Sequence, residues 1–210
     1  MLTLYVYPKS RSLRTVWAAE EIHLDCVCKR VDIRSGEGHS AEYLKLHPGG
    51  KVPLLDDNGT FIFESGAICR YLVDAYGHGT IKPATQLAQG LVDQWICFAL
   101  SELEQPLWTE IKHTRVLPEE KRVPAILSVA SWEFDRAVET LISYFDPEKA
   151  DWLVENEFSL ADMFISHTLA LGEQRGHNLP ESLTHYVERC MSRPAFARAV
   201  RREEDAVSFL

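Results

Sequence analysis

The sequence predicts an α/β domain at the N-terminus followed by an all-α domain. In residues 1–77, short β-rich runs alternate with stretches whose apolar residues have helical spacing, which is typical of α/β folds. Glycine and proline interrupt this pattern at residues 77–84, and beyond them only helical periodicity is clear. A chain of 210 residues, 46% of them hydrophobic, can bury two small cores. We therefore predict an α/β domain at 1–77, a linker at 77–84 and a helical domain at 85–210.

The predicted elements of the first domain alternate between strand and helix and end with a hairpin and a helix. Alternating apolar side chains indicate strands, and apolar residues three and four apart indicate helices. In chain order we expect a strand at Leu2–Tyr7, a helix at Ser12–Ile22, a strand at Cys26–Asp32, a short helix at Ala41–Leu46, a hairpin at residues 53–63 that turns at Asn58-Gly59, and a helix from Ser65. The first crossover favours parallel strands, and the hairpin adds an antiparallel edge. This order matches the thioredoxin-like fold.

The start of the hairpin and the helix after it form a candidate ligand site. Pro53 cannot donate to a strand ladder, so it should begin the first arm. If the Val52-Pro53 bond is cis, the Val52 amide and carbonyl face outward and can pair with an extended ligand. The helix amides with the Ser65 hydroxyl would hold a carboxylate, and Glu64 would hold an ammonium group. An α-amino acid end meets both demands. The alternative is that Pro53 only begins an edge strand and Ser65 only caps a helix.

Two motifs in this region resemble a known signature. Lys51-Val52-Pro53-Leu54-Leu55 and Glu64-Ser65-Gly66-Ala67-Ile68 are similar to the glutathione-binding signature of the glutathione S-transferase superfamily. The resemblance implies that Pro53 is cis, that Val52 pairs with the cysteinyl backbone of glutathione, and that Glu64 and Ser65 hold its γ-glutamyl end.

Ser10 lies where the first strand meets the first helix. A hydroxyl at a helix N-terminus can donate a hydrogen bond to a sulfur, and the first-turn amides add partial positive charge. Both effects favour a thiolate over a thiol, whose pKa is otherwise about 8.5. Ser10 is thus our candidate for activating the thiol of a bound ligand. From the residues alone, Ser10 or Ser12 could instead be a simple helix cap.

The segment Tyr7-Pro8-Lys9-Ser10-Arg11-Ser12-Leu13-Arg14 resembles the serine-type transferases, in which an arginine follows the catalytic serine by four positions. This resemblance favours Ser10 over Ser12. In tyrosine-type members a tyrosine at the end of the first strand has the same role, which leaves Tyr5 and Tyr7 as alternatives. Disulfide-reducing members carry a cysteine where this chain has Ser10.

Two basic residues are candidates for contact with the glycine carboxylate of glutathione. His39 lies in the loop before the second helix, where serine-type relatives often place such a group, and Lys51 could supply the same charge. A solvated side chain is the alternative for each. The chain also has His47-Pro48 where relatives usually have Asn before the proline, which we expect to affect the local turn and not the chemistry.

The second domain shows helical periodicity throughout. We expect a long helix from Thr85 to Thr109, ending near Pro106 or just past it, and another at Val123–Phe145. Ser159 and Asp162 are three apart before an apolar run, which indicates a capping box and not a catalytic acid. Candidates for an electrophile pocket, with core packing as the alternative for each, are Phe98, Trp108, Ile111 and Arg115.

Composition limits the partners and the compartment. The net charge of −9 and the absence of a basic run argue against nucleic acid or an anionic membrane as the main partner. There is no leader pattern and no apolar stretch of about 18 residues, so we expect a cytoplasmic protein. The five cysteines are scattered without Cys-x-x-Cys, which fits reduced thiols, and no metal site is expected.

We therefore predict a cytoplasmic, serine-type glutathione S-transferase that conjugates glutathione to small hydrophobic electrophiles. The resemblance also implies a homodimer and a role in detoxification. One alternative is a glutathione-dependent peroxidase or thiol reductase on the same fold. Another is a non-catalytic binding module, because a fold does not determine a function.

Overall fold

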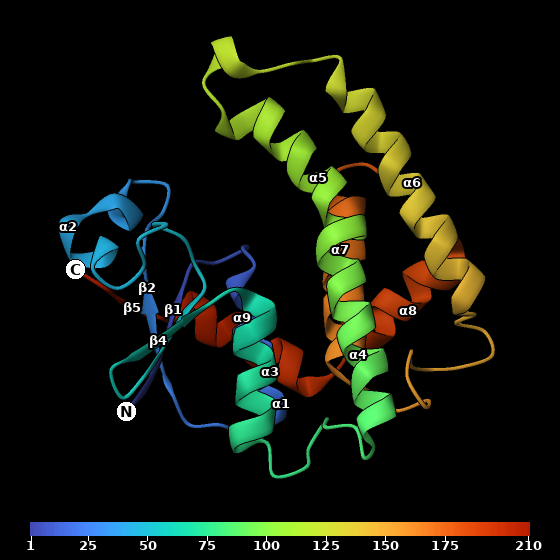
Figure 1. Ribbon diagram of the computed structural model, residues 1–210, viewed down its shortest axis with the longest axis horizontal. Helices are drawn as coiled ribbons and strands as arrows, with labels where there is room; N and C mark the ends of the chain where they lie inside the picture. The colour runs from blue at the N-terminus through green and yellow to red at the C-terminus, as the bar shows by residue number, and fades with distance from the viewer. The chain divides into compact units, whose positions relative to one another are not determined.

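The structure is a computed structural model that describes residues 1–210. The chain forms two compact units (Figure 1). The first unit consists of Met1–Lys82 together with Ser192–Leu210, and the second is Pro83–Met191. The boundary between Lys82 and Pro83 falls within the expected linker at 77–84. The end of the chain differs from the expected division, because Ser192–Leu210 belongs to the first unit and not to a helical domain at 85–210.

The first unit is built on a five-stranded mixed sheet. Its strands are β1 (Leu2–Val6), β2 (Val27–Arg30), β3 (Leu54–Asp57), β4 (Thr60–Phe63) and β5 (Val207–Ser208), in the order β4-β3-β1-β2-β5. β1 pairs in parallel with β2 and antiparallel with β3, and β3 and β4 form the predicted hairpin. The parallel pairing of β5 with β2 is not predicted by the sequence, because two residues are too few to show an alternating pattern.

Helices cover both faces of this sheet. They are α1 (Ser12–Glu21), α2 (Ala41–Leu44), α3 (Ser65–Tyr76) and α9 (Pro194–Glu204). α1 contacts both α3 and α9, and these three helices lie together (Figure 1). Leu4 of β1 and Trp17 of α1 are fully buried in this layer. Tyr43 of α2 lies on the other face, with its ring 5.9 Å from the Tyr5 ring. The predicted thioredoxin-like arrangement of the N-terminal part is confirmed.

Ion pairs with α1 hold α9 in the first unit. The Arg193 guanidinium donates to both carboxylate oxygens of Glu21, at 2.6 and 2.8 Å, and Glu21 is only 7% exposed. Arg198 and Arg202 both donate to the Glu20 carboxylate, at 2.8 and 2.7 Å. Ion pairs with several hydrogen bonds constrain the orientation of α9 on α1 in addition to bringing opposite charges together. Because the partners Arg193 and Glu21 are 172 residues apart, no local pattern predicts the pairing.

The second unit is all-helical, as predicted. Its helices are α4 (Gln86–Phe98), α5 (Glu104–Ile111), α6 (Ile126–Tyr144), α7 (Leu160–Gln174) and α8 (Glu181–Met191). The helix expected from Thr85 continues past Pro106, but a π-helical turn at Ala99–Leu103 separates α4 from α5. A wider turn suits the approach to Pro106, because proline has no N–H for a regular helical hydrogen bond. None of the helices has the length and apolar character that crossing a membrane requires.

The predicted capping box at the start of α7 is confirmed. Asp162 is fully buried, and its carboxylate accepts hydrogen bonds from the Ser159 and Leu153 amides, both at 2.9 Å, and from the Tyr186 hydroxyl at 2.8 Å. Burial raises the pKa of this carboxyl even though its hydrogen bonds oppose the rise. Every donor to Asp162 comes from a structural element of the second unit, which supports the capping role.

Candidate functional site

The pairing registers of the sheet bring three segments of the first unit to one edge. Tyr5 of β1 is paired with Leu54 of β3, and Leu54 is paired with Phe63 of β4. Because β3 is antiparallel to both β1 and β4, the chain after Tyr5, the chain before Leu54 and the chain after Phe63 all lead to the same edge of the sheet. The three segments reached there are the turn before α1, the residues before Pro53, and the start of α3. All three contain residues that the sequence identifies as candidates.

The segment before β3 carries a cis peptide bond between Val52 and Pro53, in agreement with the expectation from the resemblance. The backbone N–H and carbonyl of Val52 form no backbone hydrogen bond, and the residue is half-buried. The preceding carbonyl, that of Lys51, accepts a 2.6 Å hydrogen bond from the hydroxyl of Tyr43, which is fully buried. The hydrogen bond from Tyr43 thus holds the backbone before Val52 and leaves the N–H and carbonyl of Val52 available to a ligand.

The loop beside Val52 depends on a close approach of two glycines. A Cβ on Gly38 would lie 2.5 Å from the Gly50 carbonyl oxygen, and a Cβ on Gly50 would lie 2.7 Å from the Gly38 oxygen. Gly50 also has φ +62°, a value that L side chains rarely adopt. The contact holds the loop that carries His39 against the segment that carries Lys51. Both of these basic side chains are exposed.

Glu64 has an unusual backbone conformation at the start of α3. Its φ is 72° and its ψ is 119°, while its carbonyl accepts the Ile68 amide at 2.9 Å and so begins the helix. The Glu64 side chain is exposed and does not cap the helix. Ser65, the first residue of α3, is 4% exposed. A left-handed non-glycine residue costs about 1–3 kcal/mol and is often found at ligand sites, where it aims polar groups.

His47 explains the departure from the family pattern at His47-Pro48. Its Nδ1 atom accepts the Gly49 amide at 3.0 Å, as an Asn side chain could, and its ring lies 5.2 Å from that of Phe63. Burial lowers the pKa of the imidazole, which favours the neutral form needed to accept this hydrogen bond. The imidazole is therefore itself part of the local turn, which is where the sequence places the effect of this residue.

Ser10 and Ser12 occupy different environments in the turn between β1 and α1. Ser12 is fully buried, and its hydroxyl accepts the Tyr7 amide at 3.0 Å and lies 3.0 Å from the Tyr7 carbonyl. Ser10 is half-buried, and its hydroxyl oxygen accepts the Ser12 amide at 3.1 Å. The two hydroxyl oxygens are 2.8 Å apart. Of the two serines, Ser10 is the one that an outside ligand can reach.

The tyrosine alternatives are placed differently. Tyr5 is 5% exposed and belongs to an apolar cluster with Val31, Tyr43 and Leu54. Burial raises the pKa of its phenol, which works against ionisation. Tyr7 is half-buried beneath the Arg34 guanidinium, which lies 5.6 Å from its ring centroid.

Glu203 is a buried acid at this turn that sequence reasoning missed. It is 2% exposed and comes from α9, yet its carboxylate accepts hydrogen bonds from the Ser12 hydroxyl and from the Lys9 amide. Burial raises the pKa of this carboxyl to about 7. Its only sequence signal is a glutamate in a helix rich in Arg and Glu, which is more typical of a solvated face.

The electrophile-pocket candidates lie on consecutive segments of the second unit. Phe98 ends α4, Trp108 and Ile111 belong to α5, and Arg115 lies in the π-helical turn Lys112–Val116. The first three are half-buried and Arg115 is exposed. Phe98 packs edge-on against Trp95, with 5.5 Å between ring centroids, which is a packing role. A part for these residues in binding an electrophile stays a prediction.

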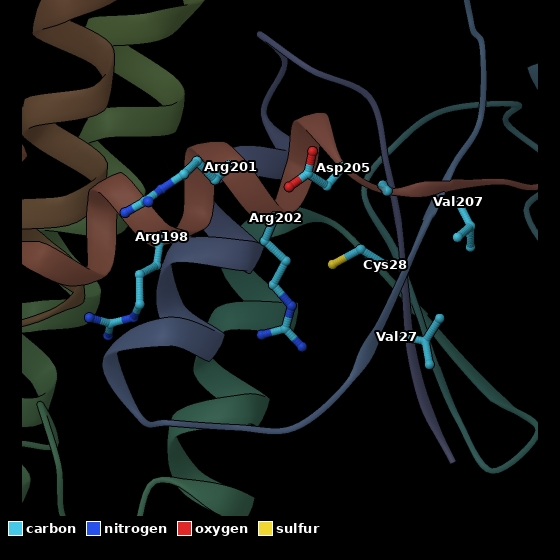
Figure 2. Close-up of a pocket in the computed structure, with 8 residues that line it drawn as sticks. Val27, Cys28, Arg198, Arg201, Arg202, Asp205 and Val207 are labelled. Carbon is cyan, nitrogen blue, oxygen red and sulfur yellow. The ribbon is translucent and has the colours of Figure 1, made fainter.

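A separate depression of about 480 Å³ lies between α9 and the strands (Figure 2). It is lined by Val27, Cys28, Arg198, Arg201, Arg202, Asp205, Ala206 and Val207, none of which is a predicted site residue. Figure 2 shows the arginines along α9 on one side and the two valines on the strands. Arg198 and Arg202 share the Glu20 carboxylate, so two of the three cations already have an acidic partner. No group of three or more His, Cys, Asp or Glu side chains could hold a metal ion.

Comparisons with known proteins identify the family. Residues 1–74 match the sequence model described as "Glutathione S-transferase, N-terminal domain". The glutathione S-transferase PM239X14 of Arabidopsis thaliana is 32% identical over 177 residues, which cover 78% of this chain and 79% of the relative. The chain belongs to the glutathione S-transferase superfamily. Glutathione S-transferase hmp2 of Hypomyces subiculosus is 38% identical to this transferase over 146 residues, which span 65% of that relative and 64% of this chain.

A solved structure agrees with the fold of this transferase. The glutathione transferase URE2P6 of Phanerochaete chrysosporium, in complex with oxidized glutathione, superposes with a TM-score of 0.83 at 23% identity and covers 97% of this chain and 96% of the other. At this identity the likeness establishes the fold alone. The predicted combination of a thioredoxin-like part and a helical part is thereby confirmed over nearly the whole chain.

Proposed function

We propose that this transferase activates the thiol of glutathione with Ser10 and conjugates it to small hydrophobic electrophiles. The observation that carries the proposal is that three segments converge at one edge of the sheet. They do so because Tyr5, Leu54 and Phe63 are paired side by side on neighbouring strands. That edge offers a reachable hydroxyl, an unpaired backbone segment and a helix N-terminus, which are the groups that a thiol peptide needs.

Each end of glutathione has a matching group in the first unit. The Val52 amide and carbonyl pair with the cysteinyl backbone by strand addition. The first amides of α3 and the Ser65 hydroxyl hold the γ-glutamyl carboxylate, and Glu64, which is exposed and does not cap the helix, holds the ammonium group. His39 and Lys51 meet the glycine carboxylate. The ligand then lies with its sulfur beside Ser10.

The helical unit supplies the acceptor site in this proposal. Phe98, Trp108, Ile111 and Arg115 are its candidate residues, and they give an apolar surface with one cation. We also propose that the protein works in the cytoplasm as a homodimer with a role in detoxification. These last proposals rest on the family resemblance and not on a feature of the structure.

The proposal is tested by Ser10→Ala, compared with Ser143→Ala on the exposed part of α6 as a matched control. A hydrogen bond to a charged group contributes about 1.5–3 kcal/mol, so we expect conjugation to fall roughly ten- to a hundredfold in Ser10→Ala. The absorbance of bound thiolate and the conjugation of a chlorinated nitrobenzene measure the two steps. The control should keep wild-type activity.

Two results would favour the alternatives. High peroxide or disulfide reduction by the wild type, with little conjugation, would point to a peroxidase or reductase. No heat of glutathione binding in calorimetry would point to a non-catalytic module. Creation of reductase activity by Ser10→Cys, absent from the parent, supports the transferase.

A further inference from the structure

Glu203 is a buried titratable group for which the proposed function has no role so far. Its carboxylate lies beneath the turn that carries Ser10 and receives the Ser12 hydroxyl and the Lys9 amide. A buried ionised carboxylate is costly unless a cation or several donors satisfy it. The groups that act on Glu203 include these two donors and the acidic Glu204, but no cation. Such a carboxyl is prepared to accept a proton.

A continuous path of hydroxyl groups connects this acid to the surface of the site. The Ser10 and Ser12 hydroxyl oxygens are 2.8 Å apart, and the Ser12 hydroxyl donates to Glu203 Oε1. The single hydrogen of Ser12 could also bond the Tyr7 carbonyl at 3.0 Å, but an ionised carboxylate is the stronger acceptor. With Glu203 ionised, both hydroxyls therefore donate inward: Ser10 to Ser12, and Ser12 to Glu203.

We propose that Glu203 receives the thiol proton of glutathione through Ser10 and Ser12, and thereby turns the Ser10 hydroxyl toward the sulfur. This inference rests on the proposed function, because it places the thiol beside Ser10. The thiol gives its proton to Ser10 Oγ, Ser10 gives its own to Ser12 Oγ, and Ser12 gives its own to Glu203. The S–H bond breaks, an O–H bond forms on the carboxyl, and each serine ends with one hydrogen.

The transfer reverses every hydrogen bond in the path. The protonated Glu203 now donates to Ser12, Ser12 donates to Ser10, and Ser10 donates to the thiolate. The lone pairs suffice for this arrangement, since Ser12 Oγ accepts only the Tyr7 amide and Glu203, and Ser10 Oγ accepts only groups of Ser12. An inward-pointing Ser10 would be unable to stabilise a thiolate. Glu203 is thus a positioning residue that keeps the total charge of the site unchanged when the thiolate forms.

The surroundings of Glu203 favour its neutral form. Burial is the main cause of the raised pKa of Glu203, and Glu204, which follows it on α9, raises it further. From the turn and α1, the Lys9 amide and the Ser12 hydroxyl donate to Glu203. Arg202, the preceding residue, is paired with Glu20 instead.

The test counts protons released to the buffer per thiolate formed. Calorimetry of glutathione binding in buffers of different protonation enthalpy gives the protons, and ultraviolet absorbance gives the thiolate. A suitable condition is about pH 7.5, where Glu203 is mostly ionised and the free thiol, with a pKa of about 8.5, is mostly protonated. The wild type should release far fewer protons than thiolates formed, whereas Glu203→Gln should release about one per thiolate.

Three variants and one spectrum separate this role from a structural one. Ser12→Ala breaks the path and should also release about one proton per thiolate. Ser12→Thr keeps a hydroxyl at this position and should release far fewer protons than thiolates, as the wild type does. Glu204→Gln is the matched charge control and should behave as the wild type. The infrared band of a protonated carboxyl should appear on glutathione binding in the wild type and be absent in Glu203→Gln.

A wild-type ratio of protons to thiolates near one, or the same ratio in Glu203→Gln as in the wild type, would overturn the inference. Absence of thiolate in the wild type, or its persistence in Ser10→Ala, would overturn the proposed function and this inference with it.

Discussion

Replacing Glu203 with glutamine should make the protein's stability less sensitive to pH, even without a ligand. The native pKa of Glu203 is raised from 4.5 to about 7 by burial, whereas in the unfolded chain it returns to its ordinary value. As the pH rises through this interval, the unfolded chain gives up the proton first. The folded state therefore loses stability between pH 4.5 and about 7. Below that interval the contribution is fully present.

The size of the effect follows from the shift. Each unit of pKa difference corresponds to about 1.4 kcal/mol, so the wild type should lose about 3 kcal/mol across the interval on account of Glu203. We expect the stability of Glu203→Gln relative to the wild type to rise by about that amount between roughly pH 4 and pH 8, measured by urea unfolding. All other titrating groups cancel in this difference. Curves that stay parallel across the interval would refute the reasoning, as would an equal rise in Glu204→Gln.

Three further predictions concern the frame of the site. Tyr43→Phe removes the hydroxyl that donates to the carbonyl before Val52, and should raise the KM for glutathione several-fold and lower the stability by about 1 kcal/mol. An unchanged KM would show that the segment keeps its conformation without this hydrogen bond. Gly38→Ala drives a Cβ into the Gly50 carbonyl and should weaken glutathione binding in calorimetry about tenfold, unlike Gly90→Ala, whose Cβ meets open space. Glu21→Ala removes the carboxylate that accepts two hydrogen bonds from the Arg193 guanidinium and should cost about 3 kcal/mol in urea unfolding. Truncation of the exposed Arg136–Glu139 pair should change stability by less than about 1 kcal/mol, and equal effects of the two truncations would contradict the burial argument.

The sequence predicted the parts of the candidate site that are contiguous in the chain. The turn residues of the hairpin, the proline at the start of β3 and the serine at the start of α3 each have a local physical cause, so their order alone places them. The tight turn of the hairpin also fixes the register between β3 and β4, whereas no local pattern sets the registers of β1 with β2 and β3. The motif before β3 and the turn before α1 are therefore predictable from the order of residues alone.

The support beneath the site could not be predicted in the same way. Tyr43 looks like an ordinary core aromatic until its hydroxyl is seen on the Lys51 carbonyl. The hydroxyl of Ser12 meets a carboxylate 191 residues further along the chain. The sequence also gives no reason to expect that α9 returns to the first unit, because Arg193 and Arg198 pair with acids of α1 that are far from them in the chain.

The two buried acids, Asp162 and Glu203, show why burial alone does not identify a functional group. Burial raises the pKa of both carboxyls. Asp162 has backbone amides and the buried hydroxyls of Ser159 and Tyr186 as donors, so a proton arriving there would have no exposed hydroxyl to come through and would break bonds that fix α7. Glu203 has one hydroxyl donor whose neighbour, Ser10, is half-exposed. A route that ends at a reachable hydroxyl distinguishes an acid that can exchange a proton with a ligand from one that only holds a helix.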